Sequence, residues 1–156
     1  MYFLSTIGII AEFNPMHQGH KYIIDCAKKV GNTVICVLSG NFVQRGDVAI
    51  LSKEERTKSA LICGADIVAE LPVLWSMSTA QNFALGGVWQ LYNLNCEEII
   101  FGSECGDIEA IETMPTTNIA AVTLVEYRSS RRRAYALYQY GEAEYKPLSE
   151  PVVVDR

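Results

Sequence analysis

Four short apolar runs alternate along this sequence with segments in which apolar residues recur at helical spacing. Near-continuous apolar runs are typical of strands that are buried on both faces of a sheet. Apolar residues at every third or fourth position predict amphipathic helices between those strands. The predicted strands are Ser5–Ala11, Thr33–Leu38, Asp66–Leu71 and Glu98–Phe101, and the predicted helices are His20–Val30, a helix opened by Ser52, and Ser78–Leu94.

This alternation predicts an α/β fold, namely a doubly wound parallel sheet with helices on both faces. Capping signals support two of the helix starts: Ser52 with Glu55 forms a capping box, and Ser78 with Gln81 is a second candidate. A chain of 156 residues is long enough for one such domain.

The fold predicts where a ligand would bind. In doubly wound sheets the ligand lies beyond the carboxyl ends of the strands, at the point where the strand order reverses. In the usual order, the first and fourth strands flank that point. The loop after the first strand contains both histidines of the chain, His17 and His20, and the loop after the fourth is Gly102-Ser103-Glu104. We expect these two distant loops to meet at one crevice.

The two histidines stand three residues apart at the start of a predicted helix, where such residues share a face. Gly19 removes a side chain where a phosphate would approach the backbone, and Pro15 fixes the turn. The N-terminus of a helix also offers N–H donors to an anion. We interpret this segment as a cradle for a triphosphate. Imidazole N–H groups there would stabilise the charge that builds on the α-phosphoryl oxygens and on the departing pyrophosphate.

Two plainer interpretations of the histidine pair stay open. The imidazoles also suit ordinary polar residues at a helix start, or two ligands of a metal ion. No carboxylate or cysteine, however, stands at a spacing that would complete a metal set. Mg²⁺ is the expected counterion of a leaving pyrophosphate, and Glu104 is a candidate ligand for it. Glu104 is equally a candidate cap for a following helix.

Charge and cysteine content restrict the partners and the compartment. A net charge of -5 and a pI near 5.0 argue against a broad nucleic-acid-binding surface, so an RNA partner would need a local basic patch. The five cysteines form no CxxC pair, which favours a reducing compartment. The N-terminus lacks the basic start of a secretory signal, and its apolar run is too short to span a bilayer. We therefore expect a cytoplasmic protein without a membrane partner.

Four arginines are candidates for contacts with phosphate or RNA. Arg45 lies in the loop after the second strand, and Arg131, Arg132 and Arg133 form a dense basic run. The spacing of apolar residues predicts a helix over Thr117–Arg133 that ends in this run, followed by an edge strand over Ala134–Tyr140. The alternative is that these arginines are solvated charges, with the run stabilising a helix C-terminus.

Four blocks of this sequence together resemble one protein family. The first runs from Gly8 to His20, and its HxGH motif alone resembles the nucleotidyltransferase superfamily of cofactor adenylyltransferases and class I aminoacyl-tRNA synthetases. The other blocks are Ser39–Gly46 (SGNFVQRG), Gly64–Pro72 (GADIVAELP) and Phe101–Glu104 (FGSE). In this order the blocks resemble the bacterial tRNA(Met) cytidine acetate ligase family, over roughly the first two-thirds of the chain.

The resemblance implies a fold, an activity and a site. The family uses ATP to convert acetate into acetyl-adenylate, and then acetylates N4 of the wobble cytidine of elongator tRNA(Met). It implies an HxGH nucleotidyltransferase-type ATP-binding domain over residues 1–114, completed by residues 115–156. His17 and His20 are the implied catalytic residues. The implied ATP-binding residues are Ile9, Ile10, Ala11, Glu12, Phe13, Asn14, Pro15, Met16, Gln18, Gly19, Lys21, Tyr22, Gly102, Ser103 and Asn118.

Two other functions stay open. An adenylyltransferase acting on a small-molecule phosphate acceptor would share the HxGH motif, although such enzymes lack the blocks at 39–46 and 64–72. A non-catalytic ATP-binding protein is the third alternative, because family members are usually longer and carry helical regions that this chain lacks. The family's Lys-Arg pair is also replaced here by Gln139 and Tyr140.

Overall fold

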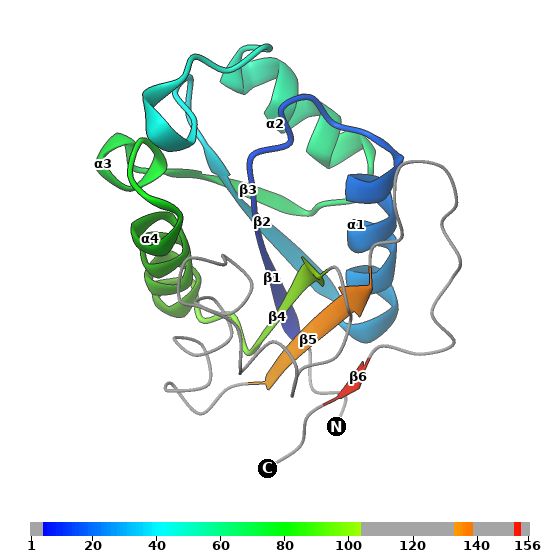
Figure 1. Cartoon of the computed structure of the whole chain (residues 1–156). Helices are drawn as coiled ribbons and strands as arrows, with labels where there is room; N and C mark the ends of the chain where they lie inside the picture. Colours follow the sequence, from blue (N-terminus) through cyan, green and yellow to red (C-terminus); the bar gives the residue numbers. More distant parts are fainter. Residues whose placement is uncertain (1–4, 104–132, 139–151, 154–156) are drawn as a thin grey trace.

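The computed structural model describes residues 5–103, 133–138 and 152–153 (Figure 1). Strands and helices alternate through the first of these ranges, as the sequence predicts. The elements are β1 Thr6–Ala11, α1 Gln18–Val30, β2 Thr33–Ser39, the 3-10 helix η1 Gln44–Gly46, α2 Lys53–Ile62, β3 Ile67–Leu71, α3 Val73–Ser76, α4 Ala80–Asn93, β4 Glu98–Ser103, β5 Arg133–Tyr138 and β6 Val152–Val153.

The strands form one sheet in the order β3-β2-β1-β4-β5-β6. All neighbouring pairs are parallel except β5 and β6, which are antiparallel. β1 pairs with β2 from Thr6 to Ala11, whereas its pairing with β4 covers only Ile7 and Gly8. The carboxyl-terminal halves of β1 and β4 therefore part. The predicted parallel sheet is confirmed, and so is the prediction that the first and fourth strands flank the point where the order reverses.

Helices cover both faces of this sheet, so the fold is doubly wound (Figure 1). On one face, Ile24 and Ala27 of α1 and Ala60 of α2 pack in one buried cluster with Ile7 and Ile9 of β1. On the other face, residues of α4 form a second buried cluster with residues of the strands: Phe83, Val88, Leu91, Ile35, Val37, Ile99 and Phe101.

Two glycines let α4 approach its neighbours closely. A Cβ at Gly86 would lie 2.5 Å from Cγ of Trp75 in α3, and one at Gly87 would lie 2.6 Å from Cγ2 of Ile10 in β1. The pair therefore serves close packing in a helix whose propensity it lowers. None of the helices in the described ranges is long and apolar enough to cross a bilayer.

Three predictions about elements are corrected. The cap of α4 is Thr79, whose side chain accepts from the Asn82 N–H, so the helix does not start with a box at Ser78. Arg133 opens β5 and does not end a helix, while the rest of the predicted helix from Thr117 lies outside the described residues. β5 is not an edge strand, because β6 pairs on its outer side.

The capping box that opens α2 is confirmed. The Ser52 hydroxyl accepts from the Glu55 N–H at 3.3 Å, and the Glu55 carboxylate accepts from the Ser52 N–H at 3.1 Å. The predicted division at residues 114 and 115 lies outside the described ranges, and it stays a prediction.

Candidate active site

The turn between β1 and α1 carries both histidines to the carboxyl-terminal edge of the sheet, where β1 and β4 part. β1 ends at Ala11, and α1 begins directly after its N-cap residue His17. Between them Phe13 adopts a left-handed backbone conformation with φ 48, and the Asn14–Pro15 peptide is cis. A left-handed conformation is uncommon for a residue other than glycine and concentrates at functional sites.

His17 and His20 lie face to face at this turn. Their ring centroids are 3.6 Å apart with an interplanar angle of 24°. His17 Nδ1 accepts a hydrogen bond from the Gly19 N–H at 3.1 Å, so a neutral His17 carries its proton on Nε2. His17 is exposed and His20 is half-buried. The predicted pairing of the two imidazoles on one face is therefore present, although one of the N–H donors expected for an anion is occupied by His17 itself.

His20 is held in its neutral form. Burial, and secondly the neighbouring His17, lower the pKa of His20 from 6.5 to about 4, against a smaller opposing contribution from the Pro15 backbone. The ring of Phe13, itself 1% exposed, supplies part of that apolar surrounding with its centroid 4.8 Å from that of His20. A neutral imidazole at pH 7 can donate one N–H to a ligand without carrying a charge.

Several residues of the predicted ATP-binding segment use their side chains within the protein. The Glu12 carboxylate accepts from the Gln44 N–H at 2.9 Å, and the Asn14 amide oxygen accepts from the Ile50 N–H at 2.7 Å. Lys21 forms an ion pair with Asp25 at 2.6 Å. Ile9 is 2% exposed and belongs to the core. Any contact of these four residues with a ligand would therefore be made by their backbone atoms.

The remaining residues of that segment line the turn and the first part of α1. Gln18 and Pro15 are exposed, Gly19 is buried, and the others are half-buried, namely Ile10, Ala11, Met16 and Tyr22. Opposite them, Gly102 and Ser103 are the last residues of β4, and so they extend the strand that the sequence predicted to end at Phe101. Asn118, Glu104, Arg131 and Arg132 lie outside the described residues.

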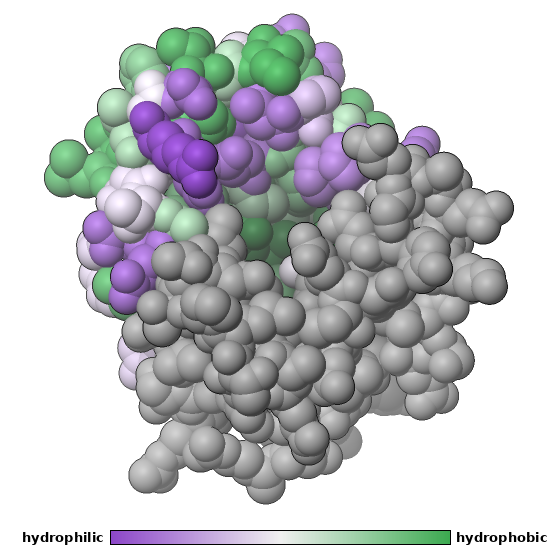
Figure 2. Space-filling model, viewed as in Figure 1, coloured by the Kyte–Doolittle hydropathy of each residue, from purple (hydrophilic) through white to green (hydrophobic). Residues whose placement is uncertain are grey.

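The loop between β2 and α2 lies at the same edge of the sheet. Arg45 is exposed there, in a left-handed conformation with φ 65, and its N–H donates to the Ser78 carbonyl at 3.4 Å. In the part of the chain that the structure describes, no ion pair involves Arg45. Figure 2, drawn from the same side as Figure 1, shows a hollow in the described surface over the position of β1 and β2. Polar side chains border this hollow.

Sequence reasoning missed one residue at this edge, Arg56 of α2. Its side chain is completely buried and donates to carbonyl groups of the turn and of the loop, as detailed below. A signal for it exists in the sequence. Arg56 stands four residues before the buried Ala60, on the inward face of α2, where a cation requires partners.

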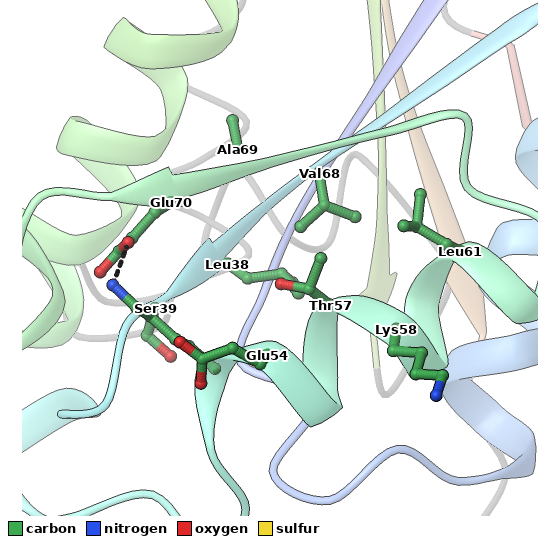
Figure 3. A pocket seen from close by; sticks show the side chains of 10 residues that line it. Leu38, Ser39, Glu54, Thr57, Lys58, Leu61, Val68, Ala69 and Glu70 are labelled. Carbon is green, nitrogen blue, oxygen red and sulfur yellow. Dashed lines mark hydrogen bonds and ion pairs between the residues drawn. The ribbon is translucent and has the colours of Figure 1, made fainter.

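A cavity of about 460 Å³ lies elsewhere, between α2 and β3 (Figure 3). Apolar and polar side chains both line it, and Lys53 and Glu70 of the lining form an ion pair of 2.8 Å. Its lining includes Leu38, Ser39, Thr57, Lys58 and Val68 but no residue of the turn that carries the histidines. The histidine pair is therefore the candidate site, because a left-handed residue of the turn and an imidazole with a lowered pKa coincide there. No group of three potential metal ligands occurs in the described ranges.

Comparison with known proteins decides the family. Residues 4–148 match the family described as HIGH Nucleotidyl Transferase. The chain belongs to this family. The match covers β1, the histidine turn and every other described element except β6.

Among the relatives of this HIGH nucleotidyltransferase are proteins named tRNA(Met) cytidine acetate ligase. The one from Geobacillus sp. (strain WCH70) is 50% identical over 109 residues, which are 69% of this chain and 27% of the relative. The one from Clostridium perfringens (strain ATCC 13124) is 49% identical over 114 residues, 71% of this chain and 28% of the relative. The chain thus spans about a quarter of the length of these relatives.

Solved structures agree with the fold. A crystal structure of Thermotoga maritima TmcAL bound with alpha-thio ATP is 39% identical with a TM-score of 0.66, covering 69% of this chain and 27% of that chain. A lipopolysaccharide core biosynthesis protein from Thermoplasma volcanium GSS1 is 14% identical with a TM-score of 0.54, covering 87% of this chain and 98% of that chain. The second likeness shows the fold alone.

Proposed function

We propose that this HIGH nucleotidyltransferase carries the ATP site of an enzyme that activates acetate as acetyl-adenylate. The acetyl group then passes to N4 of the wobble cytidine of elongator tRNA(Met). The observation that carries the proposal is the stacked His17 and His20 pair at the parting of β1 and β4. It is supported by about 50% identity, over this part of the chain, to relatives named for that reaction. A cytoplasmic location accords with a tRNA substrate.

The histidine geometry suits transfer at the α-phosphorus of ATP. An acetate oxygen attacks that phosphorus, the bond to the bridging oxygen of the β-phosphate breaks, and pyrophosphate leaves with the electron pair. The Nε2–H of His17 and an N–H of neutral His20 donate to oxygens whose charge grows in this step. The N4 amine of cytidine next attacks the acetyl carbon, AMP departs, and the amine loses a proton. No protein nucleophile is needed.

In the proposed pose, ATP lies along residues 9–22 with its triphosphate over the helix start, and Gly102 and Ser103 of β4 form the opposite wall. Asn118, which lies outside the described residues, would complete the site. Mg²⁺ would accompany the pyrophosphate. The oxygens of the nucleotide would be its main ligands. Glu104 stays the candidate protein ligand.

Recognition of RNA would fall to Arg45, which is exposed at the same edge. Arg133 pairs with Glu98 at the amino ends of β5 and β4, and so its backbone lies at the opposite edge of the sheet. The other two candidates, Arg131 and Arg132, lie outside the described residues. If Arg45 contacts a phosphate of tRNA(Met), Arg45→Ala should weaken tRNA binding and reduce its dependence on salt concentration, while ATP binding stays unchanged. An Arg45→Ala protein with the same salt dependence as wild type would remove this residue from the proposed interface.

The test of the activity is exchange of labelled pyrophosphate into ATP. We expect exchange that depends on acetate, and with tRNA(Met) present we expect acetylated tRNA. Double replacement of His17 and His20 by Ala should lower exchange by about 10²-fold or more while the protein stays folded. Lys29→Ala, an exposed change at the far end of α1, is the matched control.

Each outcome separates the three functions. Binding of ATP with no exchange for any carboxylate would contradict acetate activation and favour a non-catalytic ATP-binding protein. Release of pyrophosphate that requires a phosphorylated small molecule would instead support an adenylyltransferase for that acceptor.

A further inference from the structure

Arg56 is the largest fully buried side chain in the described part of the chain. Its guanidinium donates from Nη1 to the Glu12 carbonyl at 2.7 Å, from Nε to the Leu51 carbonyl at 3.1 Å, and from Nη2 to the Gly40 carbonyl. Nη1 also donates to the Ser39 hydroxyl at 3.3 Å. All these acceptors are neutral oxygens.

Burial of a cation has an unfavourable free energy, and so the buried Arg56 needs an explanation beyond the filling of volume. Burial lowers the pKa of Arg56, against the opposing effect of the Glu12, Glu70 and Glu54 carboxylates. Where only volume must be filled, an apolar side chain serves as well as a buried charge or better. A guanidinium is distinct in offering a planar set of donors that several carbonyls can share.

The carbonyls that share it come from separate segments. Glu12 belongs to the turn after β1, whereas Gly40 and Leu51 lie at the two ends of the loop between β2 and α2. Two further side-chain bonds join the same segments, from the Gln44 N–H to Glu12 and from the Ile50 N–H to Asn14. The turn and the loop are therefore held together as one body, with Arg56 at its centre.

A continuous series of contacts leads from Arg56 to the imidazoles. The Glu12 carbonyl that Arg56 holds belongs to the peptide that joins Glu12 to Phe13. Phe13 has the left-handed backbone conformation, and its buried ring contacts His20 at 4.8 Å between centroids. His20 in turn stacks on His17 at 3.6 Å. Rotation of that peptide would move the Phe13 ring away from His20.

We propose that Arg56 is a positioning residue of the ATP site. It fixes the Glu12–Phe13 peptide, and through it the apolar backing of His20 and the stacking of the two imidazoles. Its consequence for catalysis rests on the function proposed above. Its consequence for the histidine geometry does not, so the two can be tested apart.

The chain contains only two histidines, which makes their NMR titrations easy to assign with the help of His17→Ala. We would record the imidazole C–H signals of wild type, Arg56→Met and Arg56→Lys against pH, and measure ATP affinity by calorimetry on the same samples. Val88→Ala is the matched control, because it removes buried volume in the cluster on the opposite face of the sheet.

Arg56→Met should raise the titration midpoint of His20 from about 4 toward 6.5, as the ring loses its backing. ATP affinity should fall about tenfold or more, because the donors of the site are no longer held in place. Arg56→Lys keeps a cation, but its donors are on a single nitrogen and cannot reach the carbonyls that Nε, Nη1 and Nη2 of Arg56 bind, and so it should give a smaller change of the same sign. If Arg56→Met fails to fold, Arg56→Lys decides the question.

A folded Arg56 variant with an unaltered His20 midpoint would overturn the proposal, and so would an equal rise of the midpoint in Val88→Ala. Absence of ATP binding by the wild type would instead count against the proposed function. The His20 midpoints of the variants would still decide the role of Arg56.

Discussion

Acid should destabilise this fold through His20, and the effect can be worked out from the structure. In the folded chain the pKa of His20 is lowered to about 4, whereas the unfolded chain has the ordinary value of 6.5. Between pH 6.5 and about 4, His20 is protonated in the unfolded chain but neutral in the folded chain. Stability is therefore complete above pH 6.5 and falls as the pH drops toward 4.

The magnitude follows from the same two values. One proton bound only by the unfolded chain changes the free energy of unfolding by about 1.4 kcal/mol per pH unit. Between pH 6.5 and about 4.5 the loss of stability is then about 2 kcal/mol, allowing for the partial exposure of the ring. The Asp66 carboxyl has its pKa lowered by Lys28 and by the Val34 N–H, and so its contribution is lost only below its usual value of 3.8. Most of the His20 effect therefore comes at higher pH than the effect of Asp66.

The assay is urea unfolding of wild type and His20→Asn at a series of pH values from 8 to about 4.5. Asn cannot be protonated, and so the variant should lack this part of the pH dependence even though its stability at pH 8 will also differ. The difference between the two curves should change by about 2 kcal/mol across the range. Parallel curves for the two proteins would refute the claim that the turn holds His20 neutral.

Three further changes test the packing around the site. Gly86→Ala should destabilise the fold by about 1–2 kcal/mol, because its Cβ would meet Trp75, although alanine has the better helix propensity. An unchanged midpoint of thermal unfolding would show that α3 moves aside. Ser52→Ala should cost about 1 kcal/mol in urea unfolding by removing the cap of α2, and Ser59→Ala in the same helix provides the comparison. Asn14→Ala should free the Ile50 N–H and speed its hydrogen exchange, whereas exchange at Val34 should stay slow.

The strands and most helices could be predicted because each depends on its own local pattern. Ile7, Val34 and Ile99 lie in runs that are apolar on both faces, and all three are completely buried. The order of the strands then followed from general rules of parallel sheets. The short helix α3 was missed because four residues after Pro72 are too few to show a period.

The candidate site was predictable as a set of residue types but not as a geometry. Spacing alone placed His17 and His20 on one face, whereas their stacking depends on the left-handed Phe13 and on the His17 bond to Gly19. Arg56 was missed because its neighbours in sequence are polar, and the spacing of four residues from Ala60 was the one signal that placed it on the inward face of α2. Its burial depends on carbonyls that lie 44 and 16 residues away along the chain, at Glu12 and Gly40.

The short pairing of β1 with β4 places the candidate site between the first and the last strand of the first described range. During synthesis the histidine turn leaves the ribosome long before Glu98, because the elements from α1 to α4 lie between them in the sequence. The wall opposite the imidazoles is built only when β4 inserts beside β1, a contact between distant parts of the chain that forms slowly. We expect a nucleotide bound there to slow unfolding, because it would hold together two segments that are far apart in the sequence.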